Sequence, residues 1–178
     1  MTPVQIVMTH LSPRIASEAL MTRFSEVLPL DESRSRQCFF SNNVLLVEGP
    51  TEQTLITRLL ADKKIDGPRG GLYVLDCMGK YNIHRFMNVL SRLGISHAVI
   101  FDDDNQKDFH PELHQLIRDS KHPQHTVHLE ALAGDIEALL DIPVLDIPVQ
   151  KETRRKPQHM MYHYSTGTIK KREPSVAL

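Results

Sequence analysis

Short apolar runs alternate with amphipathic segments through the middle of this 178-residue chain. Three of the apolar runs are typical of buried strands, and they lie at residues 44–48, 72–75 and 97–101. Apolar residues recur at helical spacing over residues 51–62 and 81–93, which predicts a helix in each of those two segments. A regular alternation of strand and helix predicts an α/β fold, with a parallel sheet flanked by helices on both faces.

Turn-forming residues set the expected boundaries of these elements. Gly49 and Pro50 turn the chain after the first strand, and Thr51 is expected to cap the helix that follows. Gly94 is expected to close the second helix as a C-terminal cap.

The pattern is weaker after Asp108, where further elements are expected in four segments. A helix is expected over residues 111–120, a strand over 125–129 and a short helix over 134–140. A last helix is expected over residues 156–168, because Pro157 suits a first helical position and Gly167 suits a stop.

Composition is that of an ordinary globular protein, with 40% hydrophobic and 24% charged residues. No apolar run approaches the roughly 20 residues needed to cross a bilayer, and no signal peptide is recognisable, so we expect a cytoplasmic protein without a membrane partner. Cys38 and Cys77 suggest neither a disulfide framework nor a zinc site. His110 and His114 lie four residues apart, but no third zinc ligand follows at suitable spacing.

Charge is distributed unevenly along the chain. Residues 1–150 hold 14 Lys and Arg against 20 Asp and Glu, whereas residues 151–178 hold 7 against 2. The acidic body suits the capture of metal ions, and the basic end suits either contact with phosphates or simple solvation.

Carboxylates follow two of the predicted strands. Glu48 ends the first strand, and Asp102, Asp103 and Asp104 follow the third. Because the carboxyl ends of parallel strands share one edge of the sheet, these side chains and Glu52 are expected to gather there. Such a concentration of hard oxygen ligands suits Mg²⁺ or Mn²⁺, and two such ions can hydrolyse a phosphodiester.

Strand alternation separates the three aspartates. Residues 102 and 104 point to one side, which assigns Asp102 and Asp104 to metal and Asp103 to solvent or to a supporting role. Lys80 is a weaker candidate, for contact with phosphate, and Asp76 is as well explained as a turn residue.

The ordered set of Val47-Glu48-Gly49, Glu52, Gly79-Lys80 and Asp102-x-Asp104 resembles the toprim fold of topoisomerases, primases and several nucleases. Within that fold the chain is similar to the OLD family (overcoming lysogenisation defect), which joins an ABC-type ATPase to a C-terminal toprim nuclease. This narrower resemblance rests on segments 47–52, 134–137 and 155–157.

The resemblance also implies a division of the chain. Residues 1–37 are expected to be the end of an ABC-type ATPase domain plus a linker, since residues 6–13 resemble a strand reaching a Thr-His-Ser-Pro switch that Leu11 interrupts. Residues 38–150 would form the toprim catalytic domain, and residues 151–178 a basic segment that completes the active site. The chain contains no P-loop, so we do not expect it to hydrolyse ATP by itself.

The resemblance further implies a ligand set and a catalytic cation. The implied metal ligands are Glu48, Glu52, Asp102, Asp104, Asp135 and Glu137. Lys156 would stabilise the charge that develops on the phosphate, and Glu48 would serve as a ligand or as a general base. Simpler explanations stay open: Glu52, Asp135 and Glu137 also suit helix starts, and Lys156 lies in a basic run.

The sequence thus predicts a DNA endonuclease or nickase that uses two Mg²⁺ or Mn²⁺ ions, the catalytic part of an OLD-like ATPase-nuclease. Its expected partners are DNA, the ATPase domain of the parent protein and possibly a second copy of the chain. Two alternatives stay open. One is a metal-binding module of a topoisomerase-like or primase-like enzyme, and the other is a non-catalytic regulatory toprim remnant.

Overall fold

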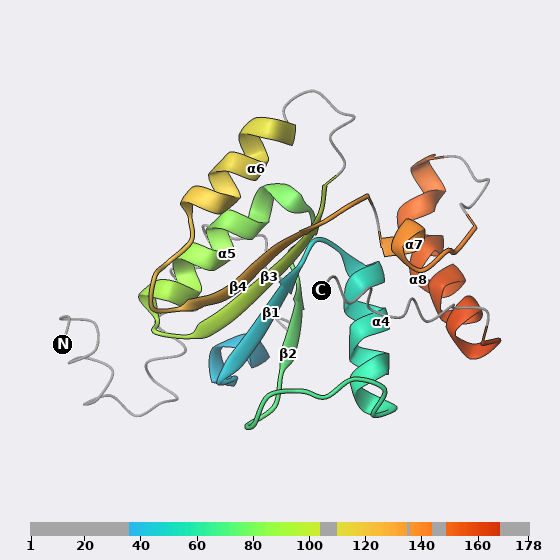
Figure 1. Ribbon diagram of the computed structural model, residues 1–178, viewed down its shortest axis with the longest axis horizontal. Coiled ribbons are helices and arrows are strands. Elements are labelled where there is room, and N and C mark those ends of the chain that lie inside the picture. The colour runs from blue at the N-terminus through green and yellow to red at the C-terminus, as the bar shows by residue number, and fades with distance from the viewer. Residues whose placement is uncertain (1–35, 104–109, 135, 144–148, 168–178) are drawn as a thin grey trace, which may run out of the picture.

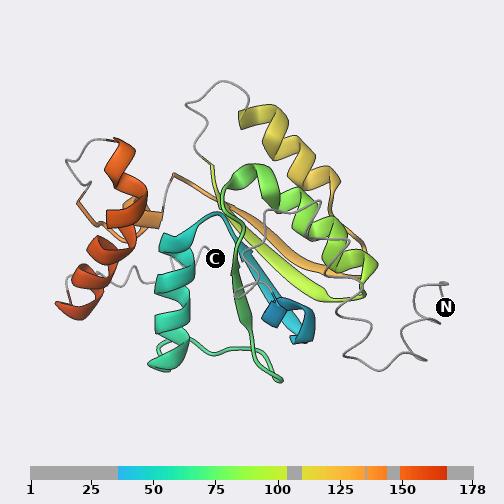
Figure 2. The same ribbon diagram turned by 180° about the vertical axis from the view of Figure 1, so that it is seen from behind.

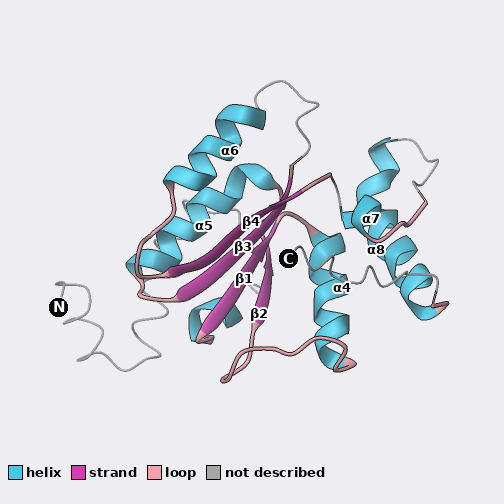
Figure 3. Cartoon of the chain, in the orientation of Figure 1, coloured by secondary structure: helices cyan, strands magenta, loops and turns pink. Residues whose placement is uncertain are grey.

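A four-stranded parallel sheet forms the centre of the protein. The computed structural model describes residues 36–103, 110–134, 136–143 and 149–167. The strands lie in the order β2-β1-β3-β4, and every neighbouring pair is parallel (Figure 3). Their bounds are β1 (Asn43–Val47), β2 (Tyr73–Asp76), β3 (Ser96–Asp102) and β4 (Thr126–Leu132). The fold class predicted from the pattern is therefore confirmed.

Helices cover both faces of this sheet. They are a 3-10 turn η1 (Arg36–Phe40) and the helices α4 (Pro50–Ala61), α5 (Lys80–Arg92), α6 (His110–Asp119), α7 (Ile136–Leu139) and α8 (Val149–Ser165). Figures 1 and 2 show α5 and α6 together on one face and α4 on the other, with α7 and α8 beyond α4. None of the described helices combines the length and apolar character needed to cross a bilayer.

Alternation along the strands divides the core between the two faces. In β3, Val99 and Phe101 are buried among residues of α5 and α6, whereas Ala98 and Ile100 pack on the α4 side. Each apolar face is removed from water by its own helix layer, which is the main favourable contribution to folding. Cys38 and Cys77 are buried in this core and are not joined in a disulfide.

A third apolar cluster joins the C-terminal helices to α4. Its buried members are Leu55 of α4, Ile136 of α7, Ile142 in the loop after α7, and Met160 of α8. This cluster lies outside the sheet, so it fixes where α7 and α8 stand relative to the end of α4.

The start of α4 differs from the prediction. Thr51 was expected to cap the helix, but α4 begins at Pro50 and Gly49 is the N-cap residue. Proline presets the helical φ at the first position and has no N–H to leave unsatisfied. The Glu52 carboxylate then accepts the N–H of Gly49 at 3.0 Å, which closes the first turn without a threonine cap.

The last helix also differs from the prediction, whereas the end of α5 agrees with it. α8 begins at Val149, so Pro157 lies inside the helix and not at its first position. Met160, fully buried against α4 and α7, stabilises the helix on the far side of the proline. Gly94 follows α5 with a φ of 73°, and the N–H of Ile95 donates to the Leu90 carbonyl, as in a Schellman cap.

Candidate metal centre

Glu48 stands directly after β1 and is anchored through its backbone. Its carbonyl accepts the N–H of Gly79 at 2.8 Å, which ties the loop after β2 to the end of β1. The Glu48 Oε2 atom is buried and makes no hydrogen bond with any residue that the structure describes. It lies 3.5 Å from the ammonium Nζ of Lys80. A buried carboxylate oxygen in this state has spare capacity to accept a cation.

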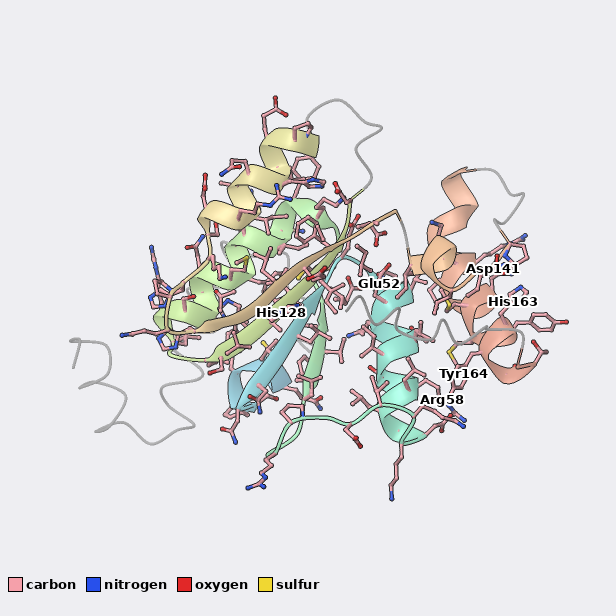
Figure 4. The ribbon with its side chains drawn as sticks, in the orientation of Figure 1. Glu52, Arg58, His128, Asp141, His163 and Tyr164 are labelled. Atoms are coloured by element: carbon pink, nitrogen blue, oxygen red, sulfur yellow. The ribbon has the colours of Figure 1, made fainter. Side chains whose placement is uncertain are left out.

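Glu52 lies in the first turn of α4, at the end of that helix nearest to the carboxyl end of β1 (Figure 4). Its side chain is 8% exposed. The pKa of Glu52 is raised to about 7, mainly by burial and to a smaller extent by the negative charges of Glu48 and Glu137. Glu48, after β1, and Glu137, in α7, therefore lie close enough to Glu52 to disfavour its ionised form.

Asp102, the last residue of β3, and Asp103, which follows it, make different contacts. The Asp102 carbonyl accepts a hydrogen bond of 2.6 Å from the ammonium of Lys80. The Asp103 carboxylate Oδ1 lies 3.2 Å from Nδ1 of His114, on α6. The Asp103 side chain thus contacts the α6 side, and its supporting role stays a prediction.

Glu48, Glu52, Asp102 and Glu137 lie near the carboxyl ends of the strands, and we call this part of the sheet the acidic edge. Glu137 contacts Lys156 on the α8 side of it. Lys156 Nζ lies 3.5 Å from Glu137 Oε1, and the Glu137 side chain is nearly buried. This contact depends on the packing of α8 against α4 and α7. The structure therefore brings the late lysine, which the sequence placed only by resemblance, to the same edge as Glu48 and Glu52.

Two of the six implied ligands, Asp104 and Asp135, lie outside the described residues. Within the described ranges, no group of three or more His, Cys, Asp or Glu side chains is arranged so that it could hold a metal ion. His114, considered above for zinc, instead contacts Lys80 and Asp103.

The two weaker candidates have structural contacts. The Asp76 carboxylate accepts the N–H of Met78 at 2.7 Å and so closes a turn, as the simpler interpretation held. Lys80 is only 4% exposed, and its ammonium contacts protein groups. Sequence reasoning missed both this burial and the part played by His114. The available signal was a lysine at the first position of a helix that follows a buried strand.

The chemistry of the described groups fits a hard divalent cation. Carboxylate oxygens are the ligands that Mg²⁺ and Mn²⁺ prefer. Glu48 offers a buried oxygen atom without a hydrogen bond from the described part of the chain, and the pKa of Glu52 is raised by burial and by the negative charges of Glu48 and Glu137. A cation bound at this edge would contact the Glu48 oxygen and would favour the ionised form of Glu52.

Comparison with known protein families gives a match over the middle of the chain. Residues 39–104 match the family model described as "Overcoming lysogenization defect protein-like, TOPRIM domain". This range includes β1, α4, β2, α5 and β3, and so contains Glu48, Glu52, Lys80 and Asp102. No curated protein matches the chain.

Proposed function

We propose that this chain, whose residues 39–104 match the OLD-like toprim domain, is the catalytic part of a DNA endonuclease or nickase. A toprim domain is a metal-binding module of nucleic-acid-processing proteins. The finer assignment, hydrolysis of DNA phosphodiester bonds with two Mg²⁺ or Mn²⁺ ions, is supported by the acidic edge described above.

One observation carries the proposal most strongly. Glu52 is buried near Glu48 and Glu137, and its pKa is raised to about 7, first by burial and then by these two negative charges. A fold built for stability alone gains nothing from three glutamates placed together at one edge, since like charges in a low dielectric destabilise one another. Perturbed acids at the carboxyl edge of a parallel sheet favour a functional site.

Metal ions at this site would supply Lewis-acid stabilisation of the attacking and leaving oxygens of the phosphodiester. Glu48, Glu52, Asp102 and Glu137 are the described residues that would contribute ligands, and Asp104 and Asp135, outside the described residues, would complete the set. Glu48 can alternatively accept a proton from the attacking water, since it ends a rigid strand at the centre of the sheet.

Lys156 would contribute charge stabilisation on the Glu137 side. Its Nζ is held 3.5 Å from Glu137 Oε1 and remains partly exposed, so it can reach a phosphate at the rim of the site. Positioned cations of this kind stabilise charge that develops in the transition state. The same proposal includes DNA as substrate and the ATPase domain of a parent protein as partner, with residues 1–37 belonging to the end of that domain. A homodimer is a further expected assembly.

Cleavage of supercoiled plasmid tests the proposal directly. We expect Glu48→Gln and Asp102→Asn each to lower the rate of Mn²⁺-dependent or Mg²⁺-dependent nicking by at least about a hundredfold, because the lost carboxylate is a metal ligand. Lys156→Met should lower the rate at saturating metal, since Lys156 acts on the phosphate.

Two exposed residues provide matched controls. Glu112→Gln on α6 and Lys121→Met, at the opposite edge of the sheet, keep the acidic edge intact, so both should cleave at the parent rate. Chelation with EDTA should abolish cleavage in every variant. Unchanged nicking by both Glu48→Gln and Asp102→Asn would refute the assignment of the site.

The same assay separates the alternatives. A topoisomerase-like module would leave a covalent protein-DNA adduct when the reaction is stopped with denaturant, with one of Tyr73, Tyr81, Tyr162 or Tyr164 as the attacking group. A nuclease leaves free ends and no adduct. A non-catalytic toprim remnant would show no heat of Mg²⁺ binding by calorimetry and no cleavage with any metal.

A further inference from the structure

Lys80 is a buried cation in an unfavourable place. It is the first residue of α5, where the helix dipole disfavours positive charge, and it is 4% exposed. Removing an ammonium from water costs several kcal/mol unless neighbouring groups compensate. The contacts of Lys80 must therefore supply that compensation.

Those contacts come from three elements. The ammonium donates to the Asp102 carbonyl at the end of β3, and it lies 3.5 Å from the Glu48 carboxylate at the end of β1. It also lies 3.5 Å from Nε2 of His114 on α6 and 5.9 Å from the centre of the Phe101 ring. One side chain thus links the ends of two neighbouring strands that carry candidate metal ligands.

His114 and Asp103 extend this link to α6. A carboxylate can only accept, so the contact of 3.2 Å between His114 Nδ1 and Asp103 Oδ1 places the ring proton on Nδ1. The lone pair of Nε2 then faces the ammonium of Lys80. His114 is itself buried, which fixes both its ring and the direction from which it contacts Lys80.

The backbone before Lys80 holds it in the same place. The N–H groups of Cys77 and Gly79 donate to the carbonyls of Val47 and Glu48, at 3.0 and 2.8 Å. Met78 and Gly79 have φ values of 57° and 109°, and such a conformation is rare for a residue with a side chain like Met78. The loop after β2 is therefore bent onto the end of β1, and it delivers the lysine to Glu48.

We propose that Lys80 is a positioning residue: the resident counter-ion of the acidic edge, which holds Glu48 and the end of β3 together when divalent metal is absent. Its burial and its contacts with Glu48 and the Asp102 carbonyl hold its ammonium inside the protein. The inference rests on the proposed function, because it assumes that Glu48 is a metal ligand. A divalent ion that binds Glu48 would take over part of the charge balance that Lys80 provides.

A double-mutant cycle in EDTA tests the pairing without metal or cleavage. Lys80→Met keeps the volume of the side chain and removes its charge, and Glu48→Gln removes the partner charge. We expect Lys80→Met to raise the unfolding equilibrium constant about tenfold in the parent chain. In the Glu48→Gln background the same change should be neutral or stabilising, because it removes an uncompensated buried charge.

Two further variants make the result specific. Lys80→Arg keeps the charge and should retain most of the stability that Lys80→Met loses. Lys121→Met removes an exposed lysine at the opposite edge of the sheet and should show no coupling to Glu48→Gln. An equal loss from Lys80→Met in both backgrounds would overturn the proposal, since it would show that Lys80 acts through packing alone.

A second measurement brings in the metal. Saturating Mn²⁺ should narrow the difference in thermal midpoint between the parent and Lys80→Met, whereas a constant difference would contradict the exchange of charge. If Mn²⁺ fails to stabilise even the parent chain, the proposed metal centre is wrong. The cycle in EDTA would then still decide whether Lys80 pairs with Glu48.

Discussion

The two ends of the same sheet treat buried polar groups in opposite ways. At the amino edge, where the strands begin, polar side chains are paired with one another in neutral hydrogen bonds. At the carboxyl edge, where the strands end, they carry charge, and the negative charges of three glutamates act on one another. Polar groups at the amino edge stabilise the fold, whereas the buried negative charges at the carboxyl edge lower its stability.

The amino edge is centred on His97 and Thr126. His97 Nδ1 lies 3.1 Å from the Ile95 carbonyl, which can only accept, so Nδ1 carries the proton and Nε2 accepts from the Thr126 hydroxyl at 2.9 Å. The Thr126 hydroxyl in turn accepts the N–H of His122 at 2.9 Å. Burial lowers the pKa of His97, so the ring stays neutral. This is the arrangement expected of a stable polar cluster in a protein interior.

The carboxyl edge has a different balance. Glu48 has a buried oxygen without a hydrogen bond from the described residues, and Glu52 has a pKa of about 7. Lys80 and Lys156 offset part of this negative charge from opposite sides. The contrast supports the proposal of a ligand site at the carboxyl edge, because the cluster of His97, Thr126 and His122 at the other edge is closed by its own hydrogen bonds.

The largest effect is expected from Glu52→Gln. In metal-free protein the Glu52 pKa lies above its ordinary value of 4.5, so the folded state binds the proton more tightly than the unfolded state does. The stability that protonation provides is therefore present below pH 4.5 and is lost as the pH rises to about 7. Glu52→Gln should remove this loss and raise the free energy of unfolding at pH 8 by about 1–3 kcal/mol.

Urea unfolding in EDTA at pH 4.5 and at pH 8 measures the effect. The same variant should lose metal-dependent cleavage, because the glutamine is a poor metal ligand. Greater stability together with lost activity would sharpen the contrast between the edges. A variant that is less stable than the parent at pH 8 would show that the carboxylate stabilises the fold, mainly through its bond to Gly49.

An intermediate effect of the opposite kind is expected from Thr126→Val at the amino edge. Valine keeps the shape but removes the hydroxyl, so His97 Nε2 loses its donor and the His122 N–H loses its acceptor. The free energy of unfolding should fall by about 1–2 kcal/mol, while the rate of plasmid nicking stays at the parent value. His128→Gln, at an exposed position of the same strand, is the control and should change neither quantity. Loss of nicking in folded Thr126→Val would break the distinction.

The smallest effect is expected from Tyr164→Phe. Tyr164 donates to Asp62 at 2.6 Å and Arg58 donates to the same carboxylate at 2.9 Å, which ties α8 to the end of α4 (Figure 4). The hydrogen bond from Tyr164 to Asp62 lies at the protein surface, so the loss in the urea midpoint should be smaller than for Thr126→Val. Tyr162→Phe, on the exposed side of α8, is the matched control. A larger loss would mean that α8, and with it Lys156, depends on this bond more than on Met160.

Much of the fold could be read from local pattern. The strands and the helices α4 to α6 lie within a few residues of the predicted segments, because apolar periodicity and glycine stops are properties of neighbouring residues. The two boundary errors have one cause. Pro50 begins a helix whereas Pro157 lies inside one, and the two prolines differ because of the residues packed around them. The burial of Met160 against α4 and α7 cannot be predicted from neighbouring residues in the sequence.

The candidate site divides in the same way. Glu48 and Asp102 could be predicted, since a carboxylate after a buried strand must lie at the edge where parallel strands end. Sequence by itself also determined that two cations, Lys80 and Lys156, were candidates there. It could not say which of them is exposed. Only the packing of α5 against the sheet and of α8 against α4 decides that, because burial and charge pairing arise between residues far apart in the chain. Tertiary structure therefore turned Lys80 from a possible phosphate contact into the buried partner of Glu48.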